Sequence, residues 1–197
     1  PVVDMIHHDG MFFFSNKNGT LFEWSNGEPR EAILIYSRTF MYMFKVKIEY
    51  STFLVTYGVD RDTNLSDDAK TSSIKIWDIY RLRDKPIRTI VIQEPGNPLL
   101  DVASLAVSPD LTHIALGLLP GQIYLVRSNS SLVNCREKDI RHRIIEENAK
   151  SHTVVNVHFA QDPIKKVTVL YSTTATSTSC FRIQEKSEQR AILHEDQ

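Results

Sequence analysis

The 197-residue chain is 42% hydrophobic, which is enough for one sizeable core, and its 23 basic and 24 acidic residues leave a net charge of −1. Without a basic excess to neutralise a phosphate backbone, nucleic-acid binding is not expected, and the absence of a run of about 18 apolar residues predicts no transmembrane segment. The two cysteines, Cys135 and Cys180, have no metal-ligand spacing, which predicts free thiols in a reducing compartment.

The first elements read as short strands. Residues 11–24 give two strands joined by the turn Asn16-Lys17-Asn18-Gly19, and Asn-Gly is the strongest short hairpin signal. Residues 31–37 predict an outer strand of the same unit. A second unit has its four strands at 41–50, 53–59, 73–79 and 87–92.

Residues 102–126 give the clearest pattern in the chain. They alternate strand, turn, strand, turn and strand, with turns at Ser108-Pro109-Asp110 and Pro120-Gly121. Pro109 presets φ, and the Asp110 side chain can bond the backbone ahead of it. Residues 143–145 supply a late outer strand to this third unit. A fourth unit has strands at 153–159, 167–172 and 179–183, with 191–193 as its closing strand.

Repeated units of four short strands are typical of a WD40-like β-propeller. The third strands are anchored by Trp24, Trp77, Val126 and Ile183. We therefore predict an all-β fold in which residues 1–197 are one partial propeller of about four blades, roughly 1–37, 41–92, 102–146 and 153–193. Four blades make an incomplete ring, so the chain is expected to be a fragment of a larger propeller of about seven blades.

An acidic stretch inside the second unit is the best candidate for a partner contact. Its carboxylates belong to Asp60, Asp62, Asp67 and Asp68. Such a surface attracts a basic partner, although a charge run on a loop is also typical of simple solvation.

The same stretch has part of a calcium-loop pattern. Asp60, Asp62 and Asn64 show its 1-3-5 oxygen spacing. However, Leu65 and Thr71 stand where an EF-hand needs Gly and Glu. We prefer a solvated hairpin loop, and we predict no metal site.

The histidines and tryptophans favour structural roles. His7 and His8 are neighbours that would point to opposite faces of a strand, and their terminal segment is expected to be poorly ordered. His152 occupies the place where many WD40 repeats carry a structural histidine. Trp24 and Trp77 are residues of the hot-spot type, but at the ends of third strands packing between blades is the preferred interpretation.

Motifs for catalysis are not found in the sequence. The serines lie outside any G-x-S-x-G turn, no Gly-rich phosphate loop is present, and no pair of carboxylates is placed for acid–base chemistry. The predicted innermost strands, such as 105–107 and 155–159, are mostly apolar, which argues against a propeller hydrolase. We therefore predict no catalytic residue, no cofactor-binding residue, no cofactor and no enzyme activity.

The order of motifs between residues 40 and 184 resembles a known family. An acidic insertion precedes the strand SIKIWDI within 53–93, the SPD and Pro-Gly turns follow within 102–129, and a long insertion precedes RIIEE at 143–147 and VVNVHFA at 154–160. This succession resembles the N-terminal WD40-like propeller of the vacuolar protein sorting-associated protein 11 family, the class C core subunits of the HOPS and CORVET tethering complexes.

The resemblance implies a non-enzymatic scaffold or interaction propeller that acts in endosome–lysosome or vacuole fusion and in vesicle-mediated protein transport. Its partners would be the other class C sorting subunits of a hetero-oligomeric complex, with Rab GTPases and SNAREs reached indirectly. Its location would be cytoplasmic, peripheral on late endosome, lysosome or vacuole membranes. Family members also carry a RING ubiquitin-ligase domain, which is not in this chain. The alternative is a WD40 adaptor that presents partners to a ubiquitin ligase or a chromatin complex.

Overall fold

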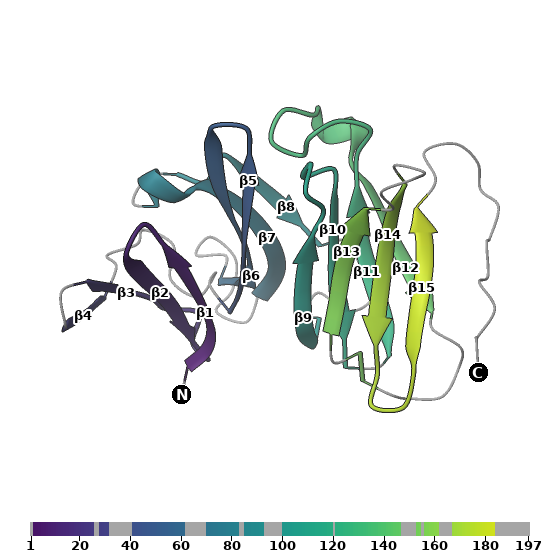
Figure 1. Ribbon diagram of the computed structural model, residues 1–197, viewed down its shortest axis with the longest axis horizontal. Helices are drawn as coiled ribbons and strands as arrows, with labels where there is room; N and C mark the ends of the chain where they lie inside the picture. The colour runs from purple at the N-terminus through teal and green to yellow at the C-terminus, as the bar shows by residue number, and fades with distance from the viewer. Residues whose placement is uncertain are drawn as a thin grey trace. The chain divides into compact units, whose positions relative to one another are not determined.

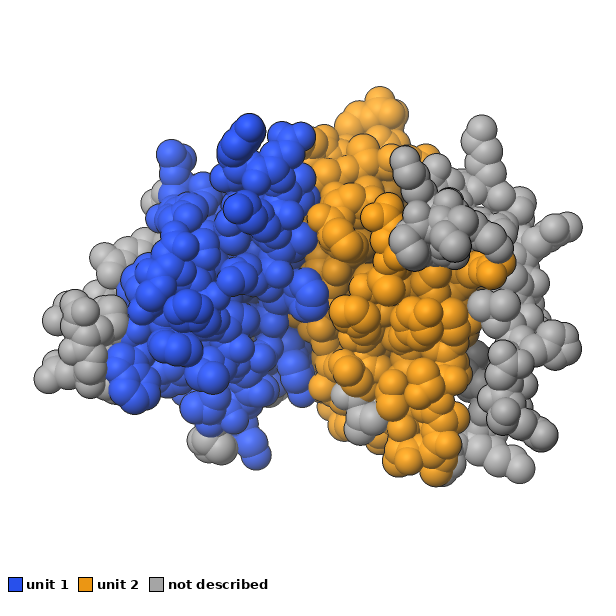
Figure 2. Space-filling model, viewed as in Figure 1, with its two compact units in different colours: residues 1–100 blue, residues 101–197 orange. Residues whose placement is uncertain are grey.

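The described residues form four antiparallel β-sheets, each built from strands that follow one another along the chain (Figure 1). The computed structural model describes residues 2–25, 28–31, 41–61, 70–82, 85–92, 100–119, 121–146, 153–154, 156–161 and 167–183. The chain divides into two compact units, Pro1–Leu100 and Asp101–Gln197, and each unit holds two of the sheets (Figure 2).

The first sheet owes its hairpins to turn residues. Its strands, in spatial order, are β1 (Val2–His8), β2 (Met11–Asn16), β3 (Leu21–Ser25) and β4 (Glu28–Glu31). Asp9 and Gly10, with φ of 47° and 77°, form the two-residue turn between β1 and β2 that Asp-Gly favours. Between β2 and β3, the carbonyl of Asn16 accepts from the amide of Gly19 at 2.9 Å, so the turn predicted from Asn18-Gly19 is confirmed.

The fourth strand of this sheet departs from the prediction. The sequence predicts an outer strand at 31–37, whereas β4 is Glu28–Glu31 and pairs with β3 so that Ser25 lies opposite Glu28. Only Asn26-Gly27 separates that pair in sequence, and this dipeptide is typical of two-residue hairpins that return the chain at once. Residues 32–40 lie outside the described residues.

The second sheet confirms its predicted strands. In spatial order they are β5 (Tyr42–Ile48), β6 (Ser51–Arg61), β7 (Lys70–Asp78) and β8 (Arg88–Val91), and a short 3₁₀ turn, η1 (Ile79–Arg81), follows β7. The long strands β6 and β7 extend further toward their connection than predicted, and Asp60 pairs with Thr71. Asp78 caps η1, because its carboxylate accepts from the amide of Tyr80 at 3.0 Å.

The core of the first unit lies between these two sheets. Phe13 and Leu21 of the first sheet pack against Leu54 and Trp77 of the second, together with Met43, Ile79 and Leu82. Trp77 is only 1% exposed, and its Nε1 donates to Thr56 Oγ1 at 3.0 Å. Burial of an aromatic side chain of this size stabilises by roughly 1.5–3 kcal/mol, so this contact is a main reason why the two sheets stay together.

The third sheet opens the second unit. Its strands, in chain order, are β9 (Val102–Val107), β10 (His113–Leu118), β11 (Gln122–Arg127) and β12 (Arg141–Glu146), with a 3₁₀ turn, η2 (Glu137–Asp139), before β12. Both predicted turns are confirmed. The amide of Leu111 donates to the carbonyl of Ser108 at 2.9 Å, and that of Gly121 donates to Leu118 at 3.0 Å. The sequence did not reveal that Leu111 takes a positive φ of 55°.

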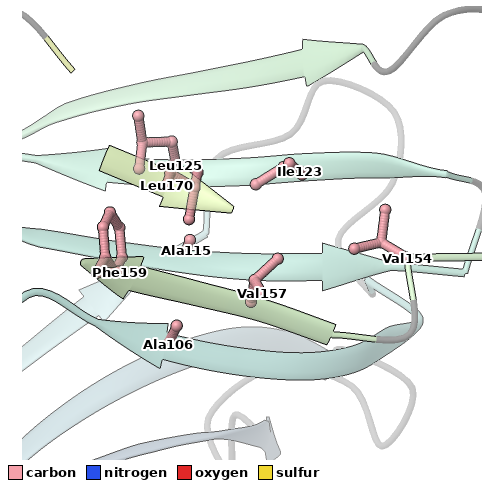
Figure 3. Close-up of a cluster of buried hydrophobic side chains, with 8 residues drawn as sticks. All are labelled: Ala106, Ala115, Ile123, Leu125, Val154, Val157, Phe159 and Leu170. Carbon is pink, nitrogen blue, oxygen red and sulfur yellow. The ribbon is translucent and has the colours of Figure 1, made fainter. Parts of the chain in front are cut away.

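The fourth sheet shows three strands within the described residues. They are β13 (Asn156–Gln161), β14 (Thr168–Thr173) and β15 (Thr178–Ile183), in that spatial order, and the predicted closing strand at 191–193 lies outside the described residues. One face of the third sheet packs on one face of the fourth through buried aliphatic and aromatic side chains (Figure 3). The cluster contains Ala106, Ala115, Ile123, Leu125, Val154, Val157, Phe159 and Leu170. Each unit is therefore a pair of sheets that share one apolar core.

Candidate functional site

The acidic residues predicted as a partner contact lie where β6 continues toward β7. The backbone of Asp60 belongs to β6 and pairs with Thr71, so Asp60 stands on a strand and not in a loop. Asp62, Asp67 and Asp68 lie outside the described residues, as does most of the calcium-like run at 60–64. Partner binding by these four carboxylates therefore stays a prediction.

A serine, a histidine and an aspartate do come together in the turn between β9 and β10. Ser108 Oγ donates to the Asp110 carboxylate at 2.6 Å and accepts from the backbone amides of Thr112 (3.1 Å) and His113 (2.9 Å). Ser108 is fully buried. Because its proton faces a carboxylate and its two lone pairs face amides, this hydroxyl is used up in the turn and is not a nucleophile.

The electrostatics of this cluster agree with a structural role. Burial raises the pKa of Asp110, but hydrogen bonds from Ser108 and Thr112 and the nearby His113 outweigh it, so the pKa lies below its ordinary value. The carboxylate is thus ionised at neutral pH and holds the turn as an acceptor. His113 Nδ1 contacts Thr112 Oγ1 at 2.7 Å. The arrangement explains how the turn supports the positive φ of Leu111.

The run His7-His8-Asp9 belongs to an ordered hairpin. The prediction of a poorly ordered terminus is wrong, because β1 continues to His8 and pairs with β2. The prediction of opposite faces is confirmed, since the His7 ring lies 4.8 Å from Phe12 and the His8 ring lies 5.1 Å from Tyr80. The two imidazoles do not form one site.

Asp9 connects this hairpin to the second sheet. Its Oδ2 accepts from the Tyr80 hydroxyl at 2.8 Å and lies 3.5 Å from His8 Nε2. The hydrogen bond to Asp9 raises the pKa of Tyr80 above its ordinary value. The phenol is therefore a neutral donor at physiological pH, and the contact serves to join the β1–β2 turn to η1.

A second contact between the sheets is made by Asp4. Its carboxylate accepts from the amide of Met43 on β5 at 2.7 Å and from that of Met5 at 2.8 Å. Burial raises the pKa of Asp4, partly offset by these two amides. Burial, with the charge of Asp4 second, also raises the pKa of Tyr42. Sequence reasoning missed this residue, because a lone Asp on a strand carries no signal of its distant partner.

The two tryptophans have different environments. Trp77 packs between the sheets, as predicted, whereas Trp24 is 47% exposed, so the prediction of packing between blades is wrong for Trp24 in this chain. Elsewhere, His142 Nδ1 lies 2.8 Å from the Tyr124 hydroxyl, and burial lowers the pKa of His142. The predicted structural histidine His152 lies outside the described residues.

The described residues show no centre for metal chemistry. No group of three or more His, Cys, Asp or Glu side chains among them could hold a metal ion. Cys135 and Cys180 are free thiols, and Cys135 is buried with its Sγ 3.8 Å from the carbonyl of Leu132. In the part of the chain that is described, no helix is long and apolar enough to cross a membrane.

The architecture defines the class of protein. Successive antiparallel sheets of three or four strands, paired face to face over apolar cores, are blades of a WD40-like β-propeller. The model of the PEP5/VPS11 N-terminal family matches residues 7–197. The chain belongs to this family, which confirms the resemblance seen in its motifs. A search of curated proteins gave no match.

Membership of the family supports a role in the vacuolar sorting and tethering complex. The family domain is a scaffold of a tethering subunit, which suggests a non-enzymatic role. It acts in a complex with other sorting subunits, and that complex is associated with vacuoles and endosomes.

Proposed function

We propose that this chain is a non-enzymatic interaction propeller of the HOPS and CORVET tethering complexes, which acts in endosome–lysosome or vacuole fusion and in vesicle-mediated protein transport. The observation that carries the proposal is the family match over residues 7–197. The buried Ser108 hydroxyl adds support, because the place that brings Ser, His and Asp together uses these groups to fix a turn.

The proposal includes partners, location and domain organisation. The other class C sorting subunits bind the propeller, and Rab GTPases and SNAREs are reached through them. The protein is cytoplasmic and lies on the surface of late endosomes, lysosomes or vacuoles. Residues 1–197 form one partial propeller, with blades at roughly 1–37, 41–92, 102–146 and 153–193.

Co-purification tests the proposal. A tagged natural polypeptide is expected to recover the other class C subunits from a membrane-free extract, and its depletion is expected to leave unfused endosome or vacuole fragments. Recovery of a cullin-type ligase or a chromatin complex without any class C subunit would refute the proposal and favour a WD40 adaptor.

The acidic residues give a finer proposal, namely that Asp60, Asp62, Asp67 and Asp68 contact a basic surface of one partner. The test is the triple variant Asp62→Asn, Asp67→Asn and Asp68→Asn, which removes three charges and leaves the strand residue Asp60 in place. The matched control neutralises three exposed acidic residues elsewhere, by Glu49→Gln, Asp101→Asn and Glu137→Gln.

The two variants separate this contact from general charge effects. If the contact exists, the first triple variant recovers less of one class C subunit, and its deficit grows at low ionic strength, where screening is weakest. The control recovers the subunits as the wild type does. Equal recovery by both variants would reject the acidic contact and leave the tethering role intact.

A further inference from the structure

One register position recurs in three of the described sheets. In each of them a residue of the second strand lies opposite a residue of the third strand, on the face turned away from the next sheet in the chain. The pairs are Phe12–Trp24 in the first sheet, Leu54–Trp77 in the second and Leu170–Phe181 in the fourth.

In two of these sheets the pair is covered by the preceding sheet of the same unit. Leu54 and Trp77 pack on the first sheet and are 0% and 1% exposed. Leu170 is also 0% exposed in the cluster shared with the third sheet, and Phe181 packs against that cluster. The position is therefore a packing position between blades wherever its neighbour is within the same unit.

In the first sheet the same position faces solvent. Phe12 is 42% exposed and Trp24 is 47% exposed, although Phe13 and Leu21 on the other face of the same strands are buried. Because side chains alternate between the two faces of a strand, both faces of this sheet are apolar. One is covered by the second sheet and the other is open.

The open face extends beyond the pair. We define the Trp24 face as the outward side chains of β1 to β3, which are Met5, His7, Phe12, Phe14, Phe22 and Trp24. Met5 is 59% exposed. Phe14 and Phe22 stack with ring centroids 5.1 Å apart. Over these three strands the face carries no Asp, Glu, Lys or Arg side chain, and a patch of this kind marks an interaction site on an otherwise charged surface.

We propose that the Trp24 face is a blade-packing surface, covered in the natural polypeptide by one further blade that lies outside residues 1–197. Its occupant is an antiparallel sheet with an apolar face, as the first sheet presents Phe13 and Leu21 to Trp77. The recurring register position selects this occupant, because the equivalent pairs pack on such a sheet. The lack of charge on the face disfavours a basic, acidic or phosphate-bearing partner. The inference rests on the propeller fold and not on the tethering role.

Hydroxyl-radical footprinting with mass spectrometry tests the proposal at single residues. In chain 1–197, Met5 and Trp24 are expected to be oxidised readily, whereas in the natural polypeptide both lose most of this reactivity. Tyr50, which is fully exposed, is the control that reacts equally in both, and Trp77 is the control that stays protected in both. Equal oxidation of Trp24 in the two proteins would overturn the proposal.

A substitution separates the further blade from other occupants. Trp24→Glu is expected to leave the melting temperature of chain 1–197 unchanged, to lower that of the natural polypeptide and to expose Met5 there. The matched control Tyr50→Glu changes neither. Two results would overturn the proposal: protection of Trp24 that appears only as the natural polypeptide dimerises, which indicates a second copy, or protection that appears only with phosphatidylcholine vesicles, which indicates a membrane.

Discussion

A single methyl group at position 117 is expected to destabilise the second unit. Gly117 lies on β10 opposite Ser104 of β9. A Cβ at this position would overlap Ser104 Oγ and would lie 2.8 Å from Val154 Cγ1 and 3.1 Å from the Val154 carbonyl oxygen. The first two contacts are closer than real Cβ atoms come to any neighbour, so Gly117→Ala requires the strands or Val154 to move.

The size of the effect follows from what must move. Inserting a methyl group into a packed core costs typically about 1–3 kcal/mol. Val154 is fully buried, and its amide donates to the carbonyl of Leu118 at 3.2 Å, so a shift of its backbone also strains a hydrogen bond with a net value of about 1 kcal/mol. We therefore expect Gly117→Ala to lower the free energy of unfolding by about 2–3 kcal/mol.

Ser104 provides the internal control. Its Oγ is buried without a hydrogen-bond partner in the described structure, so Ser104→Ala removes an unsatisfied group and is expected to be neutral or stabilising by about 1 kcal/mol. The same change frees space beside position 117. The double variant should therefore be more stable than the sum of the single effects, with a coupling of about 1 kcal/mol or more.

Native-state hydrogen exchange measures this prediction where it applies. Trp24 and Trp77 both lie in the first unit, so tryptophan fluorescence does not report on β9, β10 and β13, whereas peptides from these strands do. A loss of about 2 kcal/mol lowers their protection about 30-fold. Unchanged protection in Gly117→Ala, or equal losses with and without Ser104→Ala, would refute the close packing inferred at Gly117.

Three further predictions concern the first unit. Because burial raises the pKa of Asp4 above its ordinary value of 3.8, the folded state holds this proton more tightly than the unfolded chain, so the contribution of Asp4 is full below 3.8 and is lost as pH rises through the raised folded pKa. The unfolding free energy of the wild type, minus that of Asp4→Asn, should fall with increasing pH in urea titrations, and a flat difference contradicts the assignment. Trp77→Ala should cost about 3–5 kcal/mol and Trp24→Ala at most about 0.5 kcal/mol in chain 1–197, and equal urea midpoints for the two variants would contradict their different burial. Gly10→Ala, at a φ of 77° with open space around the added Cβ, should cost about 1–2 kcal/mol through backbone strain alone, and thermal melts should show that Gly10→Asn costs less.

The sequence predicted most strands because their signals are local. Alternation of apolar residues and turn residues such as Asn18-Gly19 and Pro120-Gly121 act within a few positions, and the structure has strands and turns there. The error at β4 has the same origin, since Asn26-Gly27 is as strong a hairpin signal as Asn18-Gly19 but was outweighed by the apolar run at 32–36.

The contacts that join the sheets could not be predicted from local patterns. Asp4 and Met43 are far apart in sequence, and so are Asp9 and Tyr80, yet each pair is held by one short hydrogen bond. A carboxylate on a strand reads as a solvated group unless its partner is known. The roles of such residues depend on the pairing of sheets, which a single sequence without its neighbours in space does not encode in any short motif.

Trp24 and Trp77 show why residue type alone does not identify a binding surface. Both are third-strand tryptophans, and each lies opposite an apolar residue of the second strand. Their exposures of 47% and 1% differ because the first sheet covers Trp77, while the face that holds Trp24 has no such sheet over it in this chain. The energy of covering Trp24 is therefore still available to a partner, and the register position it shares with Trp77 favours another sheet of the same kind as that partner.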